Sequence, residues 1–138
     1  SDILAIRTWG ASVVVTLIED HEFRLLGIEN LPSEVATQGM NWRHLPIRDV
    51  DVPDERFNRL WPRLGVEIHQ CLDAGERILI HCRGGLGRTG LLAALILVER
   101  GCTPKEAIKR VRTARPGTIE TAAQESFVLN SSQSTPCR

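Results

Sequence analysis

Three short apolar segments have the length and composition of β-strands. The first, at positions 12–18, contains three successive valines, a β-branched run that favours a strand buried on both faces. The second covers positions 42–47 and ends near Pro46, which has no backbone N–H to contribute to a sheet. The third covers positions 77–81. We expect these segments to form the sheet of the protein.

The longest predicted helix lies between the second and third strands. Asp54 follows a proline and is a suitable N-cap, and Gly75 can close the C-terminus. Between these two residues, apolar side chains recur at three- and four-residue steps: Phe57, Leu60, Trp61, Leu64, Ile68, Cys71 and Leu72.

Further helices are predicted before and after this one. Positions 89–100 are apolar nearly all round, which is typical of a central helix. Shorter helices are expected over 20–27 with Asp20 as the cap, after a capping box formed by Thr103 and Glu106, and from about Thr118. Because strands alternate with helices, the sequence predicts an α/β fold with three layers, in which helices cover both faces of a mainly parallel central sheet.

The 138 residues suit one domain over positions 1–130, followed by a flexible polar tail over 131–138. Hydrophobic residues make up 42% of the chain, yet no apolar run is long enough to span a membrane. The first residues lack the basic start and cleavage site of a signal peptide. The net charge is zero, so no overall field favours nucleic acid.

The cysteines show neither a disulfide framework nor a zinc site. They stand at positions 71, 82, 102 and 137, and no two of them form a C-x-x-C pair. Free thiols in a reducing compartment are therefore expected, and we predict a cytoplasmic location.

The chemistry is concentrated at positions 81–90, His-Cys-Arg-Gly-Gly-Leu-Gly-Arg-Thr-Gly, between the third strand and the apolar helix. At such a junction, backbone N–H groups and the helix dipole form an anion site. Cys82 would lie at its base as a thiolate, stabilised by the helix N-terminus and by Arg88. The guanidinium of Arg88 matches two oxygens of a phosphate group. The phosphate-binding residues would be Arg83, Gly84, Gly85, Leu86, Gly87 and Arg88. The alternative is a glycine-rich turn beside a buried cysteine.

These residues resemble the signature H-C-x-x-G-x-G-R-T/S of the protein tyrosine phosphatase superfamily. The resemblance implies two steps, in which Cys82 attacks phosphorus to form a phosphocysteine and water then hydrolyses it. It also implies that Thr89 assists the departing thiolate and that His81 favours the thiolate form. A helix N-terminal hydroxyl and a strand-end histidine bonded to backbone are the structural alternatives. No metal or organic cofactor is expected.

A general acid is expected on a separate loop. Asp49 comes just after the second strand, where the strands of a parallel sheet present ligands. It also matches the aspartate after Pro-Ile in cyclin-dependent-kinase-associated dual-specificity phosphatases. Asp51 is the alternative acid, and Asp54 is better explained as the helix cap. The segment at 115–124 resembles one in this subfamily that brings a glutamine to the pocket, so Gln124 would orient the hydrolytic water unless it is a surface residue.

The resemblance extends from about residue 2 to 129, with one departure at the N-terminus. Relatives carry a β-hairpin before the first helix, whereas this chain starts directly at a predicted helix over 3–9. Either the sequence is truncated or the sheet is smaller.

The loop also bears on the substrate. Phosphoinositide phosphatases tend to have basic residues inside it, whereas Leu86 is apolar here and only Arg83 is basic. The chain has no tyrosine to form a deep phosphotyrosine pocket. We therefore predict a monomeric phosphatase acting on phosphotyrosine and/or phosphoserine/threonine in proteins, with no nucleic acid or membrane partner.

A cluster of cations would guide an acidic substrate or form a solvated helix face: Lys105, Lys109, Arg110, Arg112 and Arg115.

The sequence leaves three alternatives to this function. A phosphate-binding adaptor without activity is disfavoured because the expected nucleophile, clamp and acid are all present, and turnover of an aryl phosphate distinguishes it. A phosphoinositide or small-molecule phosphatase would share the chemistry. Sulfur transfer of the rhodanese type also uses a loop cysteine, and turnover of thiosulfate would reveal it.

Overall fold

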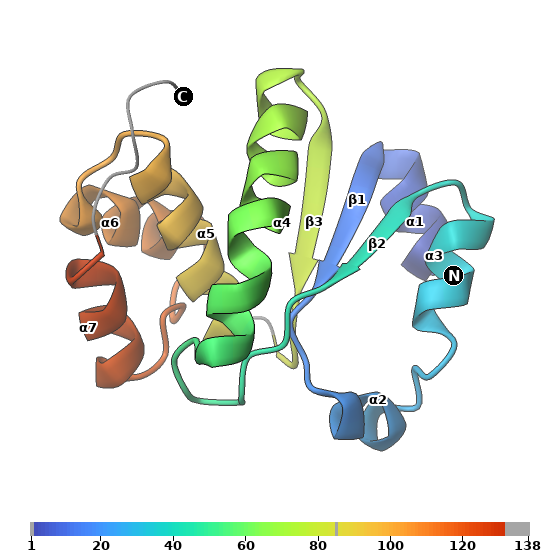
Figure 1. Ribbon diagram of the computed structural model, residues 1–138, viewed down its shortest axis with the longest axis horizontal. Helices are drawn as coiled ribbons and strands as arrows, with labels where there is room; N and C mark the ends of the chain where they lie inside the picture. Colours follow the sequence, from blue (N-terminus) through green and yellow to red (C-terminus); the bar gives the residue numbers. More distant parts are fainter. Residues whose placement is uncertain (1, 85, 132–138) are drawn as a thin grey trace. The chain divides into compact units, whose positions relative to one another are not determined.

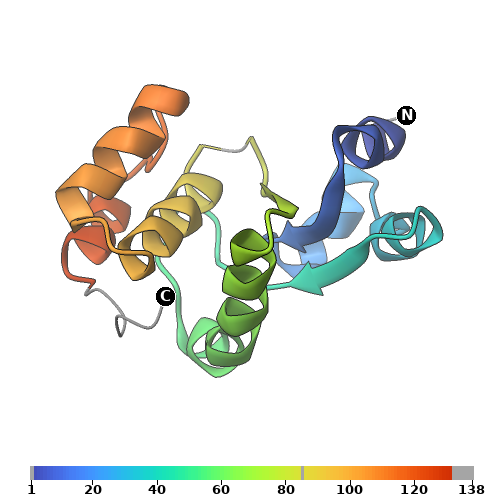
Figure 2. The same ribbon diagram turned by 90° about the horizontal axis from the view of Figure 1, so that it is seen from above.

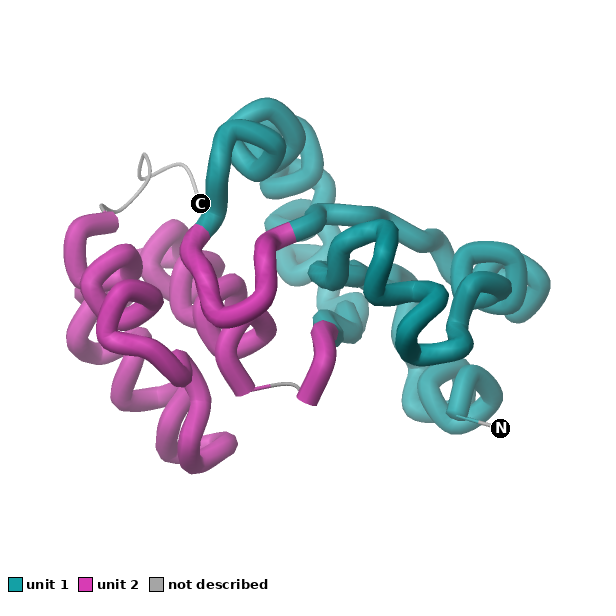
Figure 3. Tube along the Cα trace, turned by 90° about the horizontal axis from the view of Figure 1, so that it is seen from below, with its two compact units in different colours: residues 1–46, 53–81 teal, residues 47–52, 82–138 magenta. Residues whose placement is uncertain are grey.

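The computed structural model of the chain describes residues 2–84 and 86–131 (Figure 1). Gly85 lies outside the described residues. The predicted tail lies outside them as well, apart from Ser131, and it includes Cys137. The chain forms two compact units, shown in different colours in Figure 3. Unit 1 comprises residues 1–46 and 53–81, and unit 2 comprises residues 47–52 and 82–138.

Unit 1 contains the sheet. Within the described residues the sheet has three strands, β1 (Ala11–Thr16), β2 (Asn41–His44) and β3 (Arg77–His81). Their order is β2-β1-β3, and β1 is parallel to both neighbours. The predicted parallel sheet is therefore confirmed. The helices of this unit are α1 (Asp2–Trp9), α2 (Asp20–Leu26), α3 (Leu31–Thr37) and α4 (Glu55–Asp73).

Helices cover both faces of this sheet (Figure 2). On one face, Val14 of β1 belongs to a cluster with Leu31 and Val35 of α3, against which Ile3 and Ile6 of α1 pack. On the opposite face, α4 lies over the sheet, and Arg43 of β2 is bonded to Glu67 of α4. The central strand is buried on both sides, as its valine run predicts, because positions 13–15 are at most 1% exposed.

The ends of several elements differ from the predictions. Strand β2 ends at His44, earlier than predicted. The N–H of Leu45 still donates to the carbonyl oxygen of Thr16, but the following Pro46 has no N–H and cannot continue the pairing. Helix α2 is capped by Glu19 rather than by Asp20, which is its first residue. Helix α3 was not predicted.

The long helix α4 is confirmed together with its cap. Asp54 Oδ1 accepts a hydrogen bond from the backbone N–H of Arg56 at 2.9 Å. The Arg56 guanidinium also bonds the Asp54 carboxylate and lowers its pKa. Asp54 is thus a structural residue, as expected. Gly75, just beyond the helix, has a φ of +79°, a conformation that suits glycine.

Unit 2 is built on helices α5 (Arg88–Glu99), α6 (Pro104–Ala114) and α7 (Ala122–Leu129). As expected for a central helix, α5 is buried nearly all round: Arg88, Gly90, Leu91, Leu92, Ala94, Leu95, Ile96 and Val98. Thr103 caps α6 by accepting from the N–H of Glu106. None of the helices formed by the described residues has the length and apolar character needed to cross a membrane.

The last helix begins later than predicted, at Ala122 instead of near Thr118. Residues before it are held in a non-helical conformation, since Ile119 has a φ of +57° and its N–H donates to the carbonyl of Leu86. Arg112 of α6 bonds the carbonyl oxygens of Thr118 and Ile119. Tertiary contacts therefore override the local preference for helix in this segment.

Candidate active site

The described residues between β3 and α5, 82–84 and 86–87, form a loop, which we call the cysteine loop. Cys82 follows the last residue of β3 and is half-buried, and α5 begins at Arg88. Arg83 and Gly84 are exposed, Leu86 is half-buried and Gly87 is buried. Gly84 has a φ of +77°, so a side chain there would strain the backbone.

Thr89 and Cys82 are in direct contact. The Thr89 Oγ1 hydroxyl, in the first turn of α5, donates a hydrogen bond to the Cys82 sulfur at 3.0 Å. The Cys82 sulfur also lies 3.7 Å from the carbonyl oxygen of Arg83. A hydroxyl that donates to sulfur stabilises it most when the sulfur is negatively charged. The contact therefore suits a thiolate nucleophile and a thiolate leaving group.

Arg88 is an almost completely buried cation, with 1% of its surface exposed. Its Nη1 donates to the carbonyl oxygen of Ile47 at 3.0 Å, and its Nη2 lies 3.3 Å from Asp49 Oδ1. A buried guanidinium must be hydrogen-bonded and charge-compensated, because desolvation of an unpaired charge is expensive. The first residue of α5 is thereby joined to residues 47–52, which we call the aspartate loop.

Of the two candidate acids, only Asp49 is recorded in contact with Arg88. Its side chain is 49% exposed, and Oδ1 also accepts from the N–H of Val50, which has a φ of +52°. Asp51 instead accepts from the N–H of Val52 at 2.8 Å. Each carboxylate thus caps the next residue of the loop, and the contact with Arg88 distinguishes Asp49.

Gln124 is completely buried and bonded at both ends of its amide. Its Oε1 accepts from the N–H groups of Glu120 and Thr121 at 3.0 and 3.2 Å. Its Nε2 donates to the carbonyl oxygen of Asp51 at 3.0 Å. Gln124 therefore links α7 to the aspartate loop, and it is not the surface residue considered as an alternative. A Cβ added to Gly87 would lie 3.0 Å from this amide, a tight contact that favours glycine there.

Comparison with known proteins decides the family. The model described as "PTP-SAK: Swiss Army Knife protein, DSP-PTPase phosphatase domain" matches residues 1–128. The chain belongs to the dual-specificity/protein tyrosine phosphatase family. Cyclin-dependent kinase inhibitor 3 of Mus musculus is 30% identical over 129 residues, which is 92% of this chain and 60% of the mouse protein.

Two further comparisons agree. Putative tyrosine phosphatase 067L of Invertebrate iridescent virus 3 is 36% identical over 98 residues, 67% of this chain and 41% of the viral protein. The chain thus spans less than two thirds of these curated relatives. The kinase associated phosphatase, solved with its catalytic-site cysteine replaced by serine, superposes with a TM-score of 0.82 at 28% identity over 92% of this chain and 71% of that one. The predicted resemblance and fold class are confirmed.

A solved tyrosine phosphatase is similar as well. Tk-PTP in its active form has a TM-score of 0.74 and 32% identity, and the match covers 92% of this chain and 80% of that one.

Two arginines of the predicted cationic cluster support the loops of this phosphatase domain. Arg112 bonds the backbone at residues 118 and 119 and pairs with Glu125 at 2.8 Å. Arg115 donates to the carbonyl oxygen of Gly84 at 3.3 Å. Sequence reasoning missed these contacts, as well as the bond from Ile119 to Leu86, because they join backbone groups to distant residues. Lys105 and Lys109 are exposed.

His81, at the end of β3, belongs to unit 1 and bonds a side chain there, not the backbone considered as an alternative. Its Nε2 lies 2.6 Å from Thr16 Oγ1, which also accepts from the indole N–H of Trp42 at 2.8 Å. Burial lowers the pKa of His81 below its ordinary value of about 6.5. The imidazole is therefore neutral at physiological pH.

Among the described residues, Glu19, His21 and Glu22 form the group with metal-ligand side chains, and their ligand atoms lie within 4.8 Å of one another. Glu19 is paired with Arg56, and Glu22 bonds the N–H of Glu19. The carboxylates of this group therefore have a structural role, because they cap the N-terminus of α2.

Proposed function

We propose that this chain is a phosphatase that hydrolyses phosphate monoesters through a phosphocysteine intermediate, with phosphotyrosine and/or phosphoserine/threonine of proteins as substrates. One observation carries the proposal: Cys82 accepts a hydrogen bond from Thr89, and the residue before Thr89, Arg88, contacts Asp49. These two contacts within unit 2 support the assignment of Cys82 as nucleophile, Thr89 as stabilising donor, Arg88 as phosphate clamp and Asp49 as acid. Family membership supports the same chemistry.

The reaction begins when the phosphate group of the substrate binds to Arg88 and to the N–H groups of the cysteine loop. The Cys82 thiolate attacks phosphorus, the P–S bond forms, and the bond to the leaving oxygen breaks. Asp49 donates its proton to that oxygen. Arg88 stabilises the charge that spreads over the equatorial oxygens in the transition state.

Water then attacks the phosphocysteine and the P–S bond breaks. The Asp49 carboxylate takes a proton from the water, which restores the acid form for the next cycle. The Thr89 hydroxyl already donates to sulfur at 3.0 Å and stabilises the departing thiolate. Every step uses residues of this chain, and inorganic phosphate is released.

The test is a comparison of Cys82→Ser with the wild type on a chromogenic aryl phosphate. The serine variant should retain less than about a thousandth of the wild-type kcat, because serine is a poor nucleophile without an adjacent base. Wild-type enzyme quenched during turnover should show a phosphate adduct on the peptide that contains Cys82. Substantial turnover by the serine variant would rule out covalent catalysis by cysteine.

The substrate class requires a panel. Cys82→Ser, which keeps Arg88 and the loop, should bind phosphopeptides without converting them. Tighter retention of phosphoinositides or nucleotides than of phosphopeptides would instead favour a small-molecule phosphatase. The cytoplasmic location and the monomeric state stay predictions, and light scattering of the purified chain tests the second.

A further inference from the structure

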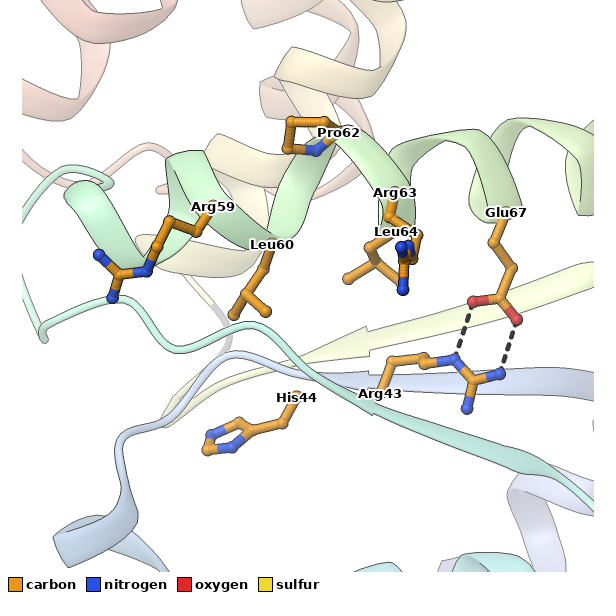
Figure 4. A pocket seen from close by; sticks show the side chains of 8 residues that line it. All are labelled: Arg43, His44, Arg59, Leu60, Pro62, Arg63, Leu64 and Glu67. Carbon is orange, nitrogen blue, oxygen red and sulfur yellow. Dashed lines mark hydrogen bonds and ion pairs between the residues drawn. The ribbon is translucent and has the colours of Figure 1, made fainter.

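A pocket in unit 1 lies between α4 and the edge strand β2 (Figure 4). Its volume is about 490 Å³, within the range of sites that enclose a peptide side chain or a small ligand. Figure 4 shows Arg59, Leu60 and Arg63 extending from α4 on the side that faces β2. The pocket belongs to none of the steps proposed for phosphate hydrolysis.

The two α4 arginines at this pocket carry like charges on one face of the helix. Arg59 and Arg63 are exposed and four residues apart, a spacing at which like charges destabilise a helix slightly. Within residues 2–84 and 86–131, no ion pair is recorded for either of them. By contrast, Arg43 at the same pocket is held by Glu67 through two bonds of 2.8 Å and bonds the carbonyl oxygen of Trp42. Two guanidinium groups are thus available to an anionic ligand.

The same face also offers apolar contact. Leu60 is 42% exposed, although a leucine is usually buried, whereas Leu64, one turn further along the pocket wall, is only 8% exposed. A free phosphate ion would use the arginines but not this surface. A nucleic acid would be expected to bind a wider cationic surface, and the chain has no net charge. Adjacent cationic and apolar groups are better matched by a peptide.

The spacing of the arginines matches an extended chain. Residues four apart in an α-helix are separated by about 6 Å along the axis, since each residue rises about 1.5 Å. In an extended peptide, side chains two residues apart point the same way and are separated by roughly 6.6 Å. Two carboxylates in the pattern Glu-x-Glu can therefore reach Arg59 and Arg63 together. Arginine and carboxylate form two parallel hydrogen bonds, which adds geometric specificity.

We propose that the pocket between α4 and β2 is a docking site for an acidic, extended peptide segment of a protein partner. The carboxylates of a Glu-x-Glu pattern pair with Arg59 and Arg63, and a neighbouring apolar side chain packs on Leu60. Docking of this kind involves no turnover, so its failure and the failure of the proposed phosphatase activity are distinguishable.

The experiment measures binding of a fluorescent, non-phosphorylated peptide with the pattern Leu-Glu-Leu-Glu-Leu by anisotropy. The test variant is Arg59→Glu/Arg63→Glu. The matched control is Lys105→Glu/Lys109→Glu, which makes the same charge change at the same spacing on α6. We expect the test variant to lose about tenfold or more in affinity, the control to change less than about twofold, and added salt to weaken binding. Leu60→Ser should weaken binding of the same peptide without changing the salt dependence.

Turnover of a small aryl phosphate shows that each variant is folded, because none of the changed residues belongs to the cysteine loop or the aspartate loop. Equal losses in the test and control variants would overturn the proposal in favour of a general charge effect. Equal binding of a Leu-Gln-Leu-Gln-Leu peptide would remove the role of the carboxylates. Tighter binding of a single-stranded oligonucleotide at Arg59 and Arg63 would replace the peptide with a nucleic acid, and absence of saturable binding would reject the site.

Discussion

The buried guanidinium of Arg88, the first residue of α5, lies 3.3 Å from the half-exposed carboxylate of Asp49 in the aspartate loop, and both residues belong to unit 2. Arg88 is held on one side by the carbonyl oxygen of Ile47, so its position does not depend on Asp49 alone. A substrate phosphate can therefore take the place of the Asp49 carboxylate at Arg88 while the guanidinium stays oriented. The displaced carboxyl group would remain beside the phosphate, where the leaving oxygen needs a proton.

This contact leads to a prediction about leaving groups. Asp49→Asn should lower kcat by about 10²–10⁴-fold for an alkyl phosphate, because its poor leaving group needs a proton. The loss should be much smaller for an activated aryl ester, whose anion leaves without help. The measurement is kcat/KM against the pKa of the leaving group.

Asp51→Asn is the control, since Asp51 bonds the N–H of Val52 and is not recorded in contact with Arg88. If Asp51→Asn rather than Asp49→Asn steepens the dependence on the leaving group, the two roles must be exchanged. If neither variant changes it, the acid lies elsewhere in the chain.

The Thr89 hydroxyl should matter most in the second chemical step. Thr89→Val keeps the shape of the side chain but removes the donor at 3.0 Å from sulfur. A hydrogen bond to a charged group contributes about 1.5–3 kcal/mol, so phosphocysteine hydrolysis should slow by roughly 10–100-fold. Rapid-quench mass spectrometry should then detect accumulated phosphoenzyme. Thr89→Ser, which restores the hydroxyl, should remain close to the wild type, and a serine variant as slow as the valine variant would contradict this role.

Gln124 has two possible roles, which can be separated by kinetics. Its amide bonds the carbonyl oxygen of Asp51, so Gln124→Ala should loosen the aspartate loop and slow the first step together with the second. If Gln124 instead orients water, only hydrolysis slows and phosphoenzyme accumulates. We expect both rates to fall by about tenfold, the loss typical of a bond of roughly 1–1.5 kcal/mol. Gln70→Ala, at an exposed glutamine of α4, is the control.

The burial of His81 predicts a dependence of stability on pH. Burial lowers the pKa of His81 in the folded protein, so below about pH 6.5 the unfolded chain takes up a proton that the folded chain resists. The free energy of unfolding is therefore unaffected by protonation of His81 above about pH 6.5. It decreases as the pH falls from there towards the lower pKa that His81 has in the folded protein. Urea denaturation at about pH 7.5 and pH 5.5 measures the difference.

His81→Gln keeps an amide near the Thr16 hydroxyl but cannot be protonated, so its stability should change less between the two pH values. His21→Gln, at an exposed histidine of α2, should behave like the wild type. Equal pH dependence in the His81 variant and the wild type would show that other groups cause the effect.

The sequence by itself determined the features that depend on neighbours along the chain. Apolar spacing located β3, α4 and α5. The strand–glycine–helix pattern placed the predicted nucleophile, Cys82, and the predicted phosphate clamp, Arg88, at the two ends of one short segment. The same local reasoning misjudged where α7 begins and did not predict α3, because short segments are decided by contacts from elsewhere.

The tertiary structure decided the partners of each polar group. These partners are distant in sequence. Asp49 contacts Arg88, and Gln124 bonds the carbonyl oxygen of Asp51. Ile119 and Arg115 likewise bond the backbone of the cysteine loop. Periodicity along a chain carries no information about such contacts. They form because a buried polar group must find a hydrogen-bond partner, and folding alone determines which groups come within reach.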